Sequence, residues 1–328
     1  MPRGSWGRTW LVVAVIVAAL VVRYELFLRA HGYRPSVKDD EYAWSWERMR
    51  AADGSQRTVA WLGASRIMLA FAPEAFTQTL PDWKYVQLAI DGTTPIGSLL
   101  DLAADPDFRG VVIFDISELG FQREHWSEQD KHIATYRRRW REVGAMLERW
   151  LATNVQSRLA LTATRTMYLT GIALRTGSWP APPYLTTYAD RTRFADYAIA
   201  DVPRLRKSRV ALVHEWVLTM RDPKAWLDDA LALEPAIAAI EARGGRVVYV
   251  RMPTCDERWD AEEKMTPKAQ FWDVLATRTR AVTVHFKDYP QLAKFPCPDT
   301  SHIDSKDGPE FTRAFLEILR ARGVFDRR

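Results

Sequence analysis

The segment RTVAWLGASR (residues 57–66) defines the expected fold more than any other part of the chain. Its apolar part, TVAWL, has the length and composition of a short buried β-strand. Gly63 and Ala64 follow at once, and small residues at this point let the chain turn sharply. Such a turn leaves the hydroxyl of Ser65 exposed at the edge of the expected sheet. On its own this pattern is common, and a plain turn after a strand explains it equally well.

Four more short apolar runs follow, and each is separated from the next by a helical stretch. They lie at 85–90, 111–116, 246–250 and 281–286. Alternating strands and helices predict an α/β fold, with a parallel sheet covered by helices on both faces. We expect five strands in the order 2-1-3-4-5, with the 57–62 strand central and the ligand site at the carboxyl ends of the strands.

The helices are indicated by apolar residues spaced by threes and fours. One long helix is expected after the third strand, with an apolar stripe made of Ile133, Tyr136, Trp140, Val143, Leu147 and Trp150. The arginines at 137–139 and 141 fall mostly on its other face, which indicates a solvated surface rather than a binding patch. A further helix is expected from 222 to the Gly244-Gly245 pair, and the last begins near Pro309.

Two segments stand outside this alternation. Residues 34–56 are charged, contain Trp44 and Trp46, and are expected to form a helical lead-in. Residues 158–213 are longer than an ordinary crossover and contain the sequence WPAPPY. We expect them to form an insertion or cap over the sheet.

Residues 1–33 carry the clearest compositional signal. Arg3 and Arg8 precede the uninterrupted apolar run 10–22, and the apolar pattern continues to Leu28, which makes it long enough to cross a bilayer. A cleaved signal peptide is the alternative, but Val-Val-Arg at 21–23 occupies the place of a cleavage site, which favours an uncleaved signal anchor. We therefore expect a single-pass membrane protein whose body faces the periplasm or the cell exterior.

The bulk composition narrows the classes of function. The 328 residues are 47% hydrophobic and 27% charged, which argues against disorder. The net charge of +5 is mild and no basic stripe is interleaved with aromatics, so nucleic-acid binding is not expected. Neither a phosphate-binding glycine loop nor zinc-ligand spacing is present, and no cofactor or metal is expected. Cys255 and Cys297 would form a disulfide in an exported chain, and two unpaired core thiols are an equal alternative.

A second motif, Asp299-Thr300-Ser301-His302, follows the last expected strand. An aspartate and a histidine three residues apart can hydrogen-bond, which fixes the imidazole tautomer and stabilises the imidazolium. Loops after the first and fifth strands of a parallel sheet open on the same edge. Ser65 and His302 can therefore meet there although they lie far apart in the sequence.

Together the two motifs resemble the SGNH (GDSL-like) hydrolase superfamily. LGASR at 62–66 and DTSHID at 299–304 match its nucleophile and Asp-x-x-His blocks in type, order and position. Gly92, in AIDGTTP, occupies the place of a glycine whose N–H helps to bind the oxyanion. The resemblance covers about 59–321, with the insertion between, and implies a flavodoxin-like three-layer sandwich and a catalytic domain over 57–328.

The resemblance also implies roles for these residues. Ser65 would be the nucleophile, His302 the general base and Asp299 its orienting group, and the N–H groups of Ser65 and Gly92 would bind the oxyanion. The substrate would be an acyl ester, for example on a cell-envelope carbohydrate, and the reaction hydrolysis or acyl transfer. Two arginines are candidate binders of an anionic substrate group, with salt bridges as the alternative. They are Arg66 and Arg251.

One family block is different in this chain. After the third strand the superfamily often has Gly-x-Asn-Asp, whose asparagine is a further oxyanion donor, whereas residues 113–118 read IFDISE. Ser117 is the candidate replacement, and an ionised Asp115 would repel an oxyanion. Two alternatives follow: a non-catalytic envelope binding or assembly protein with this fold, or a flavodoxin-like domain in which the motif matches are coincidental. The sequence indicates no protein partner.

Overall fold

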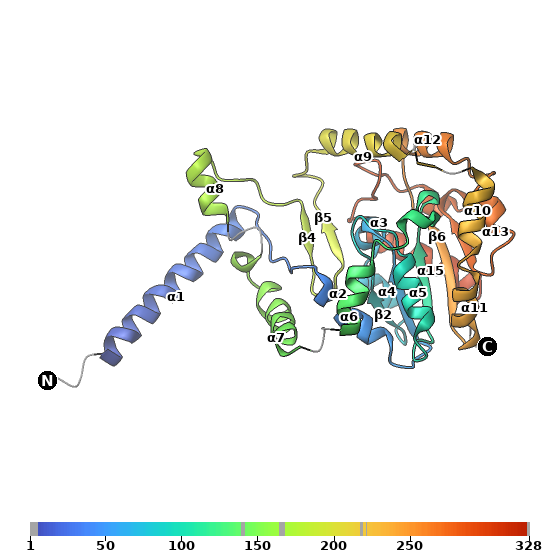
Figure 1. Ribbon diagram of the computed structural model, residues 1–328. Coiled ribbons are helices and arrows are strands. Elements are labelled where there is room, and N and C mark those ends of the chain that lie inside the picture. The colour runs from blue at the N-terminus through green and yellow to red at the C-terminus, as the bar shows by residue number, and fades with distance from the viewer. Residues whose placement is uncertain (1–5, 139–141, 164–167, 217–218, 221, 327–328) are drawn as a thin grey trace.

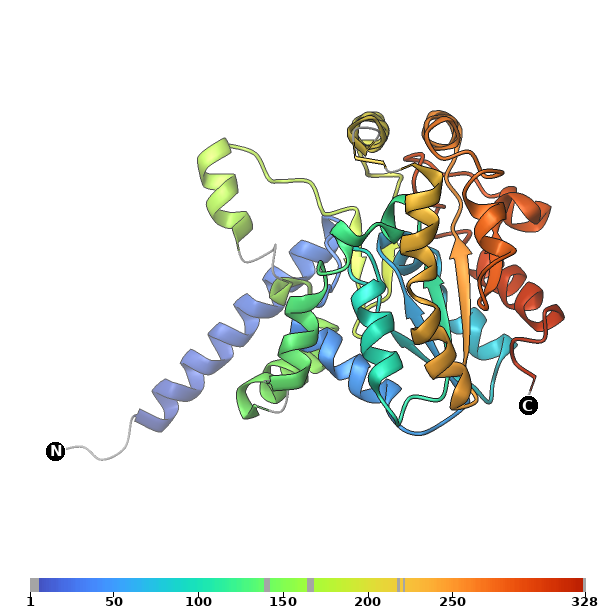
Figure 2. The ribbon, with the colours of Figure 1, turned by 45° about the vertical axis from the view of Figure 1, so that its right-hand side comes forward.

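A computed structural model describes residues 6–138, 142–163, 168–216, 219–220 and 222–326. At its centre lies a five-stranded sheet in which every pair of neighbouring strands is parallel (Figures 1 and 2). In spatial order the strands are β2 (Lys84–Gln87), β1 (Thr58–Leu62), β3 (Val111–Asp115), β6 (Arg246–Arg251) and β7 (Val282–His285). Counted along the chain within this sheet, the order is 2-1-3-4-5, as predicted. The first strand lies inside the sheet, next to the middle strand β3.

Helices cover both faces of the sheet. One face carries α2 (Glu41–Ala51), α5 (Ile96–Ala104), α10 (Pro223–Leu231), α11 (Glu234–Ala242) and α13 (Trp272–Ala276). The other carries α3 (Ser65–Ala70), α4 (Pro73–Thr79), α14 (Pro290–Ala293) and α15 (Gly308–Ala321). Alternate residues of each strand enter the two cores; Ala60 and Leu62 face the first group, and Val59 and Trp61 the second. Because both faces are buried, the strands read as continuous apolar runs.

The 34–56 segment is an integral part of the first helical layer. Asp40 caps α2 by accepting the N–H groups of Tyr42 and Ala43, at 3.1 and 3.0 Å. The Trp44 side chain is fully buried, and its indole N–H donates to the Leu88 carbonyl at 2.9 Å. The expected lead-in is thus helical, and it packs onto the sheet.

The single helix expected over 133–150 is wrong. The structure has two helices, α6 (Asp130–Arg138) and α7 (Val143–Leu151), and Glu142 before α7 has an extended backbone. Ile133 and Tyr136 pack against the core, whereas the side chains of α7 at the other end of the stripe are exposed. Trp140 lies outside the described residues. A spacing of threes and fours cannot distinguish one helix from two whose apolar faces meet different surroundings. Likewise, the helix expected over 222–245 is divided into α10 and α11.

The 158–213 insertion divides between two places. The turn η3 (Ala152–Gln156) precedes it and leads into the turn η4 (Ala160–Thr162), which packs on the N-terminal helix. Helix α8 (Leu169–Thr176) lies near the end of the same helix (Figure 1). The antiparallel hairpin β4 (Leu185–Thr187) and β5 (Arg193–Ala195) packs beside α3, and α9 (Val202–Trp216) packs on α12 (Asp256–Met265). Only the second part covers the carboxyl edge of the sheet. Further short turns in the described part of the chain are η1 (Glu118–Phe121), η2 (Arg123–His125) and η6 (Phe286–Asp288).

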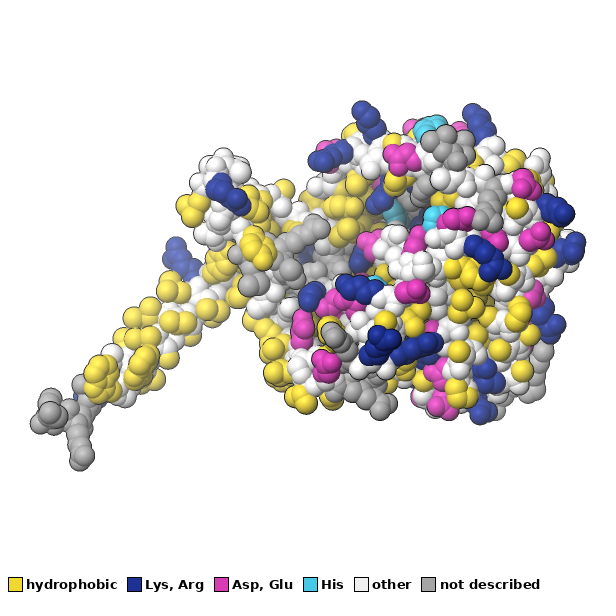
Figure 3. Space-filling view, in the orientation of Figure 1, with side chains coloured by type: hydrophobic (Ala, Val, Ile, Leu, Met, Phe, Trp, Pro, Cys, Tyr) yellow, Lys and Arg dark blue, Asp and Glu magenta, His cyan; other side chains and the backbone are white. Residues whose placement is uncertain are grey.

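The N-terminal helix α1 (Trp6–Ala30) projects from the body and is covered with hydrophobic side chains (Figures 1 and 3). It is the one described helix long and apolar enough to cross a membrane. Of its residues, only Glu25 and Leu28 are buried. Its exposed apolar surface is what a membrane span requires, and the side of a membrane that the body would face is not defined by it.

Candidate active site

The turn after β1 requires a glycine. Gly63 has a φ of +156°, and a Cβ there would lie 2.8 Å from the Cβ of Asp115 and 2.9 Å from Ile67 Cγ2. Real Cβ atoms do not approach other atoms this closely, so only glycine fits. The turn delivers Ser65 as the first residue of α3, at the carboxyl edge of the sheet.

Ser65, His302 and Asp299 form one hydrogen-bonded chain. The Ser65 Oγ lies 2.8 Å from His302 Nε2, and His302 Nδ1 lies 2.8 Å from Asp299 Oδ2. Oδ1 of Asp299 also accepts the backbone N–H groups of Ser301 and His302, at 3.0 and 2.9 Å. The predicted proximity of the three side chains is confirmed, and their catalytic role stays a prediction.

Burial and hydrogen bonds together set the protonation states of Asp299 and His302. Burial alone would raise the pKa of Asp299, but hydrogen bonds from the His302 ring and from two backbone N–H groups hold that pKa at about 2. Burial also lowers the pKa of His302, and the Asp299 carboxylate opposes this shift. The imidazole is therefore neutral near neutral pH, which is the state that can accept a proton from Ser65.

A disulfide braces the loop that carries Asp299 and His302. Cys255 and Cys297 are bonded, with their Cα atoms 5.7 Å apart, so the disulfide alternative is the correct one. The Cys255 N–H also donates to the Thr300 carbonyl at 2.9 Å, and the Thr300 N–H to the Cys297 carbonyl at 2.9 Å. The loop after β7 is thus attached to the loop after β6, directly beside the triad.

The two predicted oxyanion donors lie on the same cavity. Ser65 and Gly92 both line it, and Gly92 has a φ of +72°. Ser65 stands at the start of a helix, where backbone N–H groups have no intrahelical acceptor. Within the described part of the chain, neither N–H donates to a protein acceptor. Both are thus available to a ligand oxygen.

Asp115 takes the position after β3 where the superfamily often has its asparagine. It is buried at the cavity wall, and burial raises the pKa of its carboxyl to about 6, against the opposing effect of Arg66 and Arg251. The nearby backbone N–H groups of Met252 and of Ile67, in the first turn of α3, also favour its charged form. Asp115 therefore lies against the Gly63 turn that leads to Ser65, and Ser117 also lines the cavity.

The candidate substrate-binding arginines differ in position. Arg66 lines the cavity and forms an ion pair with Glu262 at 3.2 Å. Arg251 is 1% exposed, bonds to Glu118 at 3.0 Å and Glu262 at 2.6 Å, and does not line the cavity. The Arg251 prediction is corrected accordingly: its guanidinium stabilises buried carboxylates, because the strand end that carries it is covered by α12.

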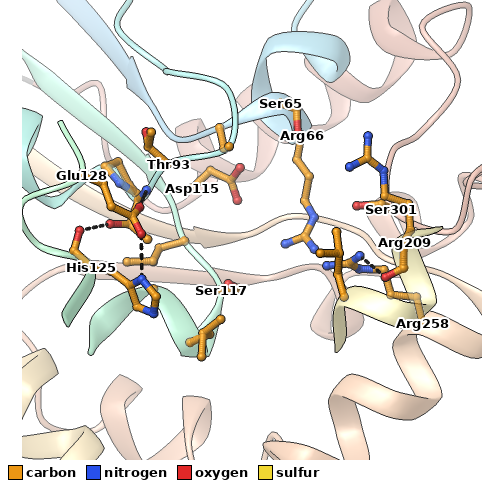
Figure 4. A pocket seen from close by; sticks show the side chains of 18 residues that line it. Ser65, Arg66, Thr93, Asp115, Ser117, His125, Glu128, Arg209, Arg258 and Ser301 are labelled. Carbon is orange, nitrogen blue, oxygen red and sulfur yellow. Dashed lines mark hydrogen bonds and ion pairs between the residues drawn. The ribbon is translucent and has the colours of Figure 1, made fainter. Parts of the chain in front are cut away.

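Sequence reasoning missed several residues of the cavity wall. Arg209 of α9 and Arg258 of α12 line it, and Arg258 Nε donates to Glu262 at 2.8 Å. On the opposite wall, His125 Nδ1 lies 2.7 Å from Glu128 (Figure 4). This hydrogen bond raises the pKa of His125, although burial acts in the opposite direction. These residues carry no local motif, and only helix packing brings them together.

The cavity has a volume of about 350 Å³, which suits a small acyl group and part of a larger substrate. Figure 4 shows Ser65 and Asp115 between the two walls, with Arg66, Arg209 and Arg258 on one side and His125 and Glu128 on the other. Among the described residues, no group of three or more His, Cys, Asp or Glu side chains is arranged to hold a metal ion.

Comparison with known proteins yields little similarity. The sequence matches no protein-family model and no curated protein. Among solved structures, the crystal structure of TesA is similar at 10% sequence identity and a TM-score of 0.37, over 80% of this chain and 98% of that chain. A likeness this weak does not define a family. The class is set by the chain's own geometry: an α/β protein with a Ser–His–Asp arrangement at the carboxyl edge of a parallel sheet.

Proposed function

We propose that this chain is a membrane-anchored serine esterase or O-acyltransferase of the SGNH type. The observation that carries the proposal is the hydrogen-bonded chain from Ser65 through His302 to Asp299, with the serine open to a cavity. A buried aspartate, a neutral histidine and an accessible serine are the parts that acyl transfer through a serine needs.

The reaction would proceed in two steps. Ser65 Oγ attacks the ester carbonyl carbon while His302 Nε2 takes the hydroxyl proton. The ester C–O bond then breaks, and His302 gives that proton to the leaving alcohol, so that an acyl group remains on Ser65. Water or an acceptor hydroxyl attacks the acyl-serine through the same histidine, which releases the acid or the new ester and restores Ser65.

The developing oxyanion would be held by backbone donors. The N–H groups of Ser65 and Gly92 lie on the same cavity, and the start of α3 adds a favourable helix dipole. No asparagine adds to them, and Asp115 opposes the oxyanion when ionised. We therefore expect a modest rate with simple esters at neutral pH.

The proposed substrate rests on the resemblance to the SGNH superfamily, and the proposed location rests on helix α1. The chain resembles superfamily members that have an N-terminal anchor and act on envelope polymers, so an acylated envelope carbohydrate is the proposed substrate. The apolar helix α1 would anchor the chain, with its body facing the periplasm or the cell exterior.

A non-catalytic envelope binding or assembly protein is the second candidate. The observation in its favour is Asp115, because a carboxylate stands where an oxyanion donor is expected. The two candidates differ in whether Ser65 is nucleophilic.

The deciding experiment treats the detergent-solubilised full-length chain with a fluorophosphonate probe and with p-nitrophenyl acetate. Wild type should be labelled, and Ser65→Ala should lose the label and about a thousandfold or more of the ester cleavage. His302→Ala should lose nearly as much, because either change disables the same proton transfer. The melting temperature of Ser65→Ala should change little, since the serine hydroxyl does not support packing. His302→Ala should lower the melting temperature, because it leaves the buried Asp299 carboxylate without its side-chain partner.

The matched control is Ser127→Ala, an exposed serine that does not line the cavity. It should keep both the label and the rate of wild type. Absence of labelling in wild type would support the non-catalytic protein, and full activity in Ser65→Ala would exclude Ser65 as the nucleophile.

A further inference from the structure

Helix α7 turns its apolar side chains outward. Five of its nine residues are large hydrophobics that are exposed: Val143 (81%), Met146 (50%), Leu147 (56%), Trp150 (58%) and Leu151 (44%). They stand at positions i, i+3, i+4, i+7 and i+8, which places them on one face of the helix. An exposed leucine is ordinary, but a complete helical face of exposed apolar side chains is not.

The inward face of α7 is the one that carries buried charge. Arg149 is 9% exposed and donates to the Ala189 carbonyl, and the buried Ala145 lies one turn before it. A helix on a protein in water normally buries its apolar stripe and exposes its charges. The reversed arrangement of α7 indicates that the medium outside this face is apolar.

The position of α7 indicates which medium that is. Through η3 and η4 the chain continues directly to the base of α1, where the buried Glu25 carboxylate accepts the N–H groups of Ala160 and Leu161, both at 2.9 Å. Leu28 of α1 also packs with Ala160 and Leu169 in a small core of its own. Both ribbon views place α7 and α1 on the same side of the body, and Figure 3 shows hydrophobic side chains gathered there.

We propose that the outward face of α7 (Val143, Met146, Leu147, Trp150 and Leu151) lies in the surface of the bilayer that α1 crosses. This inference rests on the proposed membrane anchoring. Trp150 is suited to the boundary between head groups and acyl chains, and the exposed Lys38 and Arg158 nearby suit anionic head groups. A second copy of the chain is less suitable, because a stripe on one nine-residue helix is small for a stable protein interface.

A second attachment point changes what the anchor does. A single spanning helix leaves the body free to rotate about it, whereas α1 and α7 together hold the body in one orientation. The cavity would then be presented at a constant height above the membrane, which suits an enzyme acting on a membrane-attached or surface polymer.

The test places one polarity-sensitive fluorophore at a time on the full-length chain in vesicles of phosphatidylcholine and phosphatidylglycerol. Both native cysteines are in the disulfide, so an introduced cysteine provides the reactive thiol. Leu147→Cys tests α7, Ile16→Cys tests α1, and Val274→Cys on α13 is the control for an exposed apolar residue elsewhere. Brominated lipid quenches from the acyl chains, and iodide quenches from water.

The expected result is a blue-shifted Leu147 label that loses most of its emission to brominated lipid and little to iodide, with the Val274 label showing the reverse. A Leu147 label open to iodide while the Ile16 label is quenched by lipid would overturn the proposal for α7 and leave the anchor standing. A Leu147 label protected from both quenchers would also overturn it, in favour of a protein contact. If iodide quenches the Ile16 label, the proposal that α1 crosses the membrane is itself wrong. Fluorophosphonate labelling of the same samples reports on Ser65 separately.

Discussion

At the residue scale, Asp115 combines two tasks that oppose each other. Its side chain packs against the Gly63 turn, just before the helix that starts at Ser65. Its carboxylate faces the cavity in which an oxyanion would form. Burial raises the pKa of Asp115 to about 6, so the conflict depends on pH. Below that value the neutral acid can even donate a hydrogen bond.

This leads to a prediction for the pH profile. The ester-cleavage rate of wild type should fall as the pH rises above about 6, because Asp115 ionises there, whereas burial moves the titration of His302 toward lower pH. Asp115→Asn should remove this fall and raise the rate about tenfold or more near pH 7.5, since an amide supplies a donor without charge. Measuring kcat from about pH 5 to 8 for both proteins tests it. Superimposable profiles would exclude Asp115 from the reaction.

The same residue affects stability. Because the folded-state pKa is raised from 3.8 to about 6, the folded protein binds the proton more strongly than the unfolded chain. The free energy of unfolding should therefore decrease as the pH rises from about 4 to 6, and Asp115→Asn should lessen that decrease. Urea titrations at several pH values measure the difference.

At the element scale, the site depends on tight connections after the strands. The turn after β1 accommodates no Cβ at Gly63, and the loop after β7 is held to the loop after β6 by Cys255–Cys297. Two of these loops position Ser65 and His302, which are 237 residues apart in the chain. The precision of the triad therefore depends on short, braced connections rather than on the helices themselves.

Gly63→Ala should lower the free energy of unfolding by about 1–3 kcal/mol and reduce ester cleavage, because the added methyl must displace Asp115 or Ile67. Gly171→Ala is the matched control: that glycine lies inside α8 with open space around it, so its replacement should be neutral or slightly stabilising. Thermal melts and rates of both variants give the comparison. Equal melting temperatures of the Gly63→Ala and Gly171→Ala variants would show that the turn after β1 can accommodate a methyl group.

Removing the disulfide should also weaken the site. Replacing Cys255 and Cys297 with serine should lower the free energy of unfolding by about 2–4 kcal/mol, because 42 residues separate them and the unfolded chain regains that freedom. Reductant should destabilise wild type by a similar amount and leave the double variant unchanged. Sensitivity of the double variant to reductant would mean that the effect has another cause.

At the scale of the whole molecule, the chain has two differently built surfaces. The sheet and its two helical layers are ordinary globular structure with buried apolar cores. On one side, α1 and α7 expose apolar side chains instead. The carboxyl edge of the sheet, with its cavity, is covered by α9 and α12. The molecule thus has an apolar side that is suited to contact with lipid, and a separate edge that carries the candidate active site.

The anchor can be tested with one charge. Ile16→Arg places a guanidinium in the middle of α1, where a charge in the bilayer costs about 2.5–3.5 kcal/mol on insertion scales. The variant should appear partly in the soluble fraction after alkaline extraction of membranes, whereas wild type should stay in the pellet. Val274→Arg, an equally radical change at an exposed position of α13, should behave as wild type. Equal fractionation of all three proteins would argue against a spanning α1.

The sequence by itself predicted the sheet and the meeting of Ser65 with His302, because both depend on local signals. The catalytic roles proposed for these residues come from the resemblance to a known superfamily. Continuous apolar runs predict strands that are buried on both faces. The small residues Gly63 and Ala64 predict the sharp turn before Ser65. The sequence DTSH places an aspartate one helical turn from a histidine. Parallel topology then brings loops after the first and last strands to one edge. These inferences required only strand order and the physics of short motifs.

Only the tertiary structure decided the rest. The environment of Arg251, the His125–Glu128 pair and the arginines on the cavity wall depend on which helices pack above the strand ends. The outward apolar face of α7 looked like the continuation of a core helix, since periodicity records which residues share a face and not what that face meets. Burial, partner charges and orientation are properties of contacts between distant segments, and a single sequence carries no direct record of them.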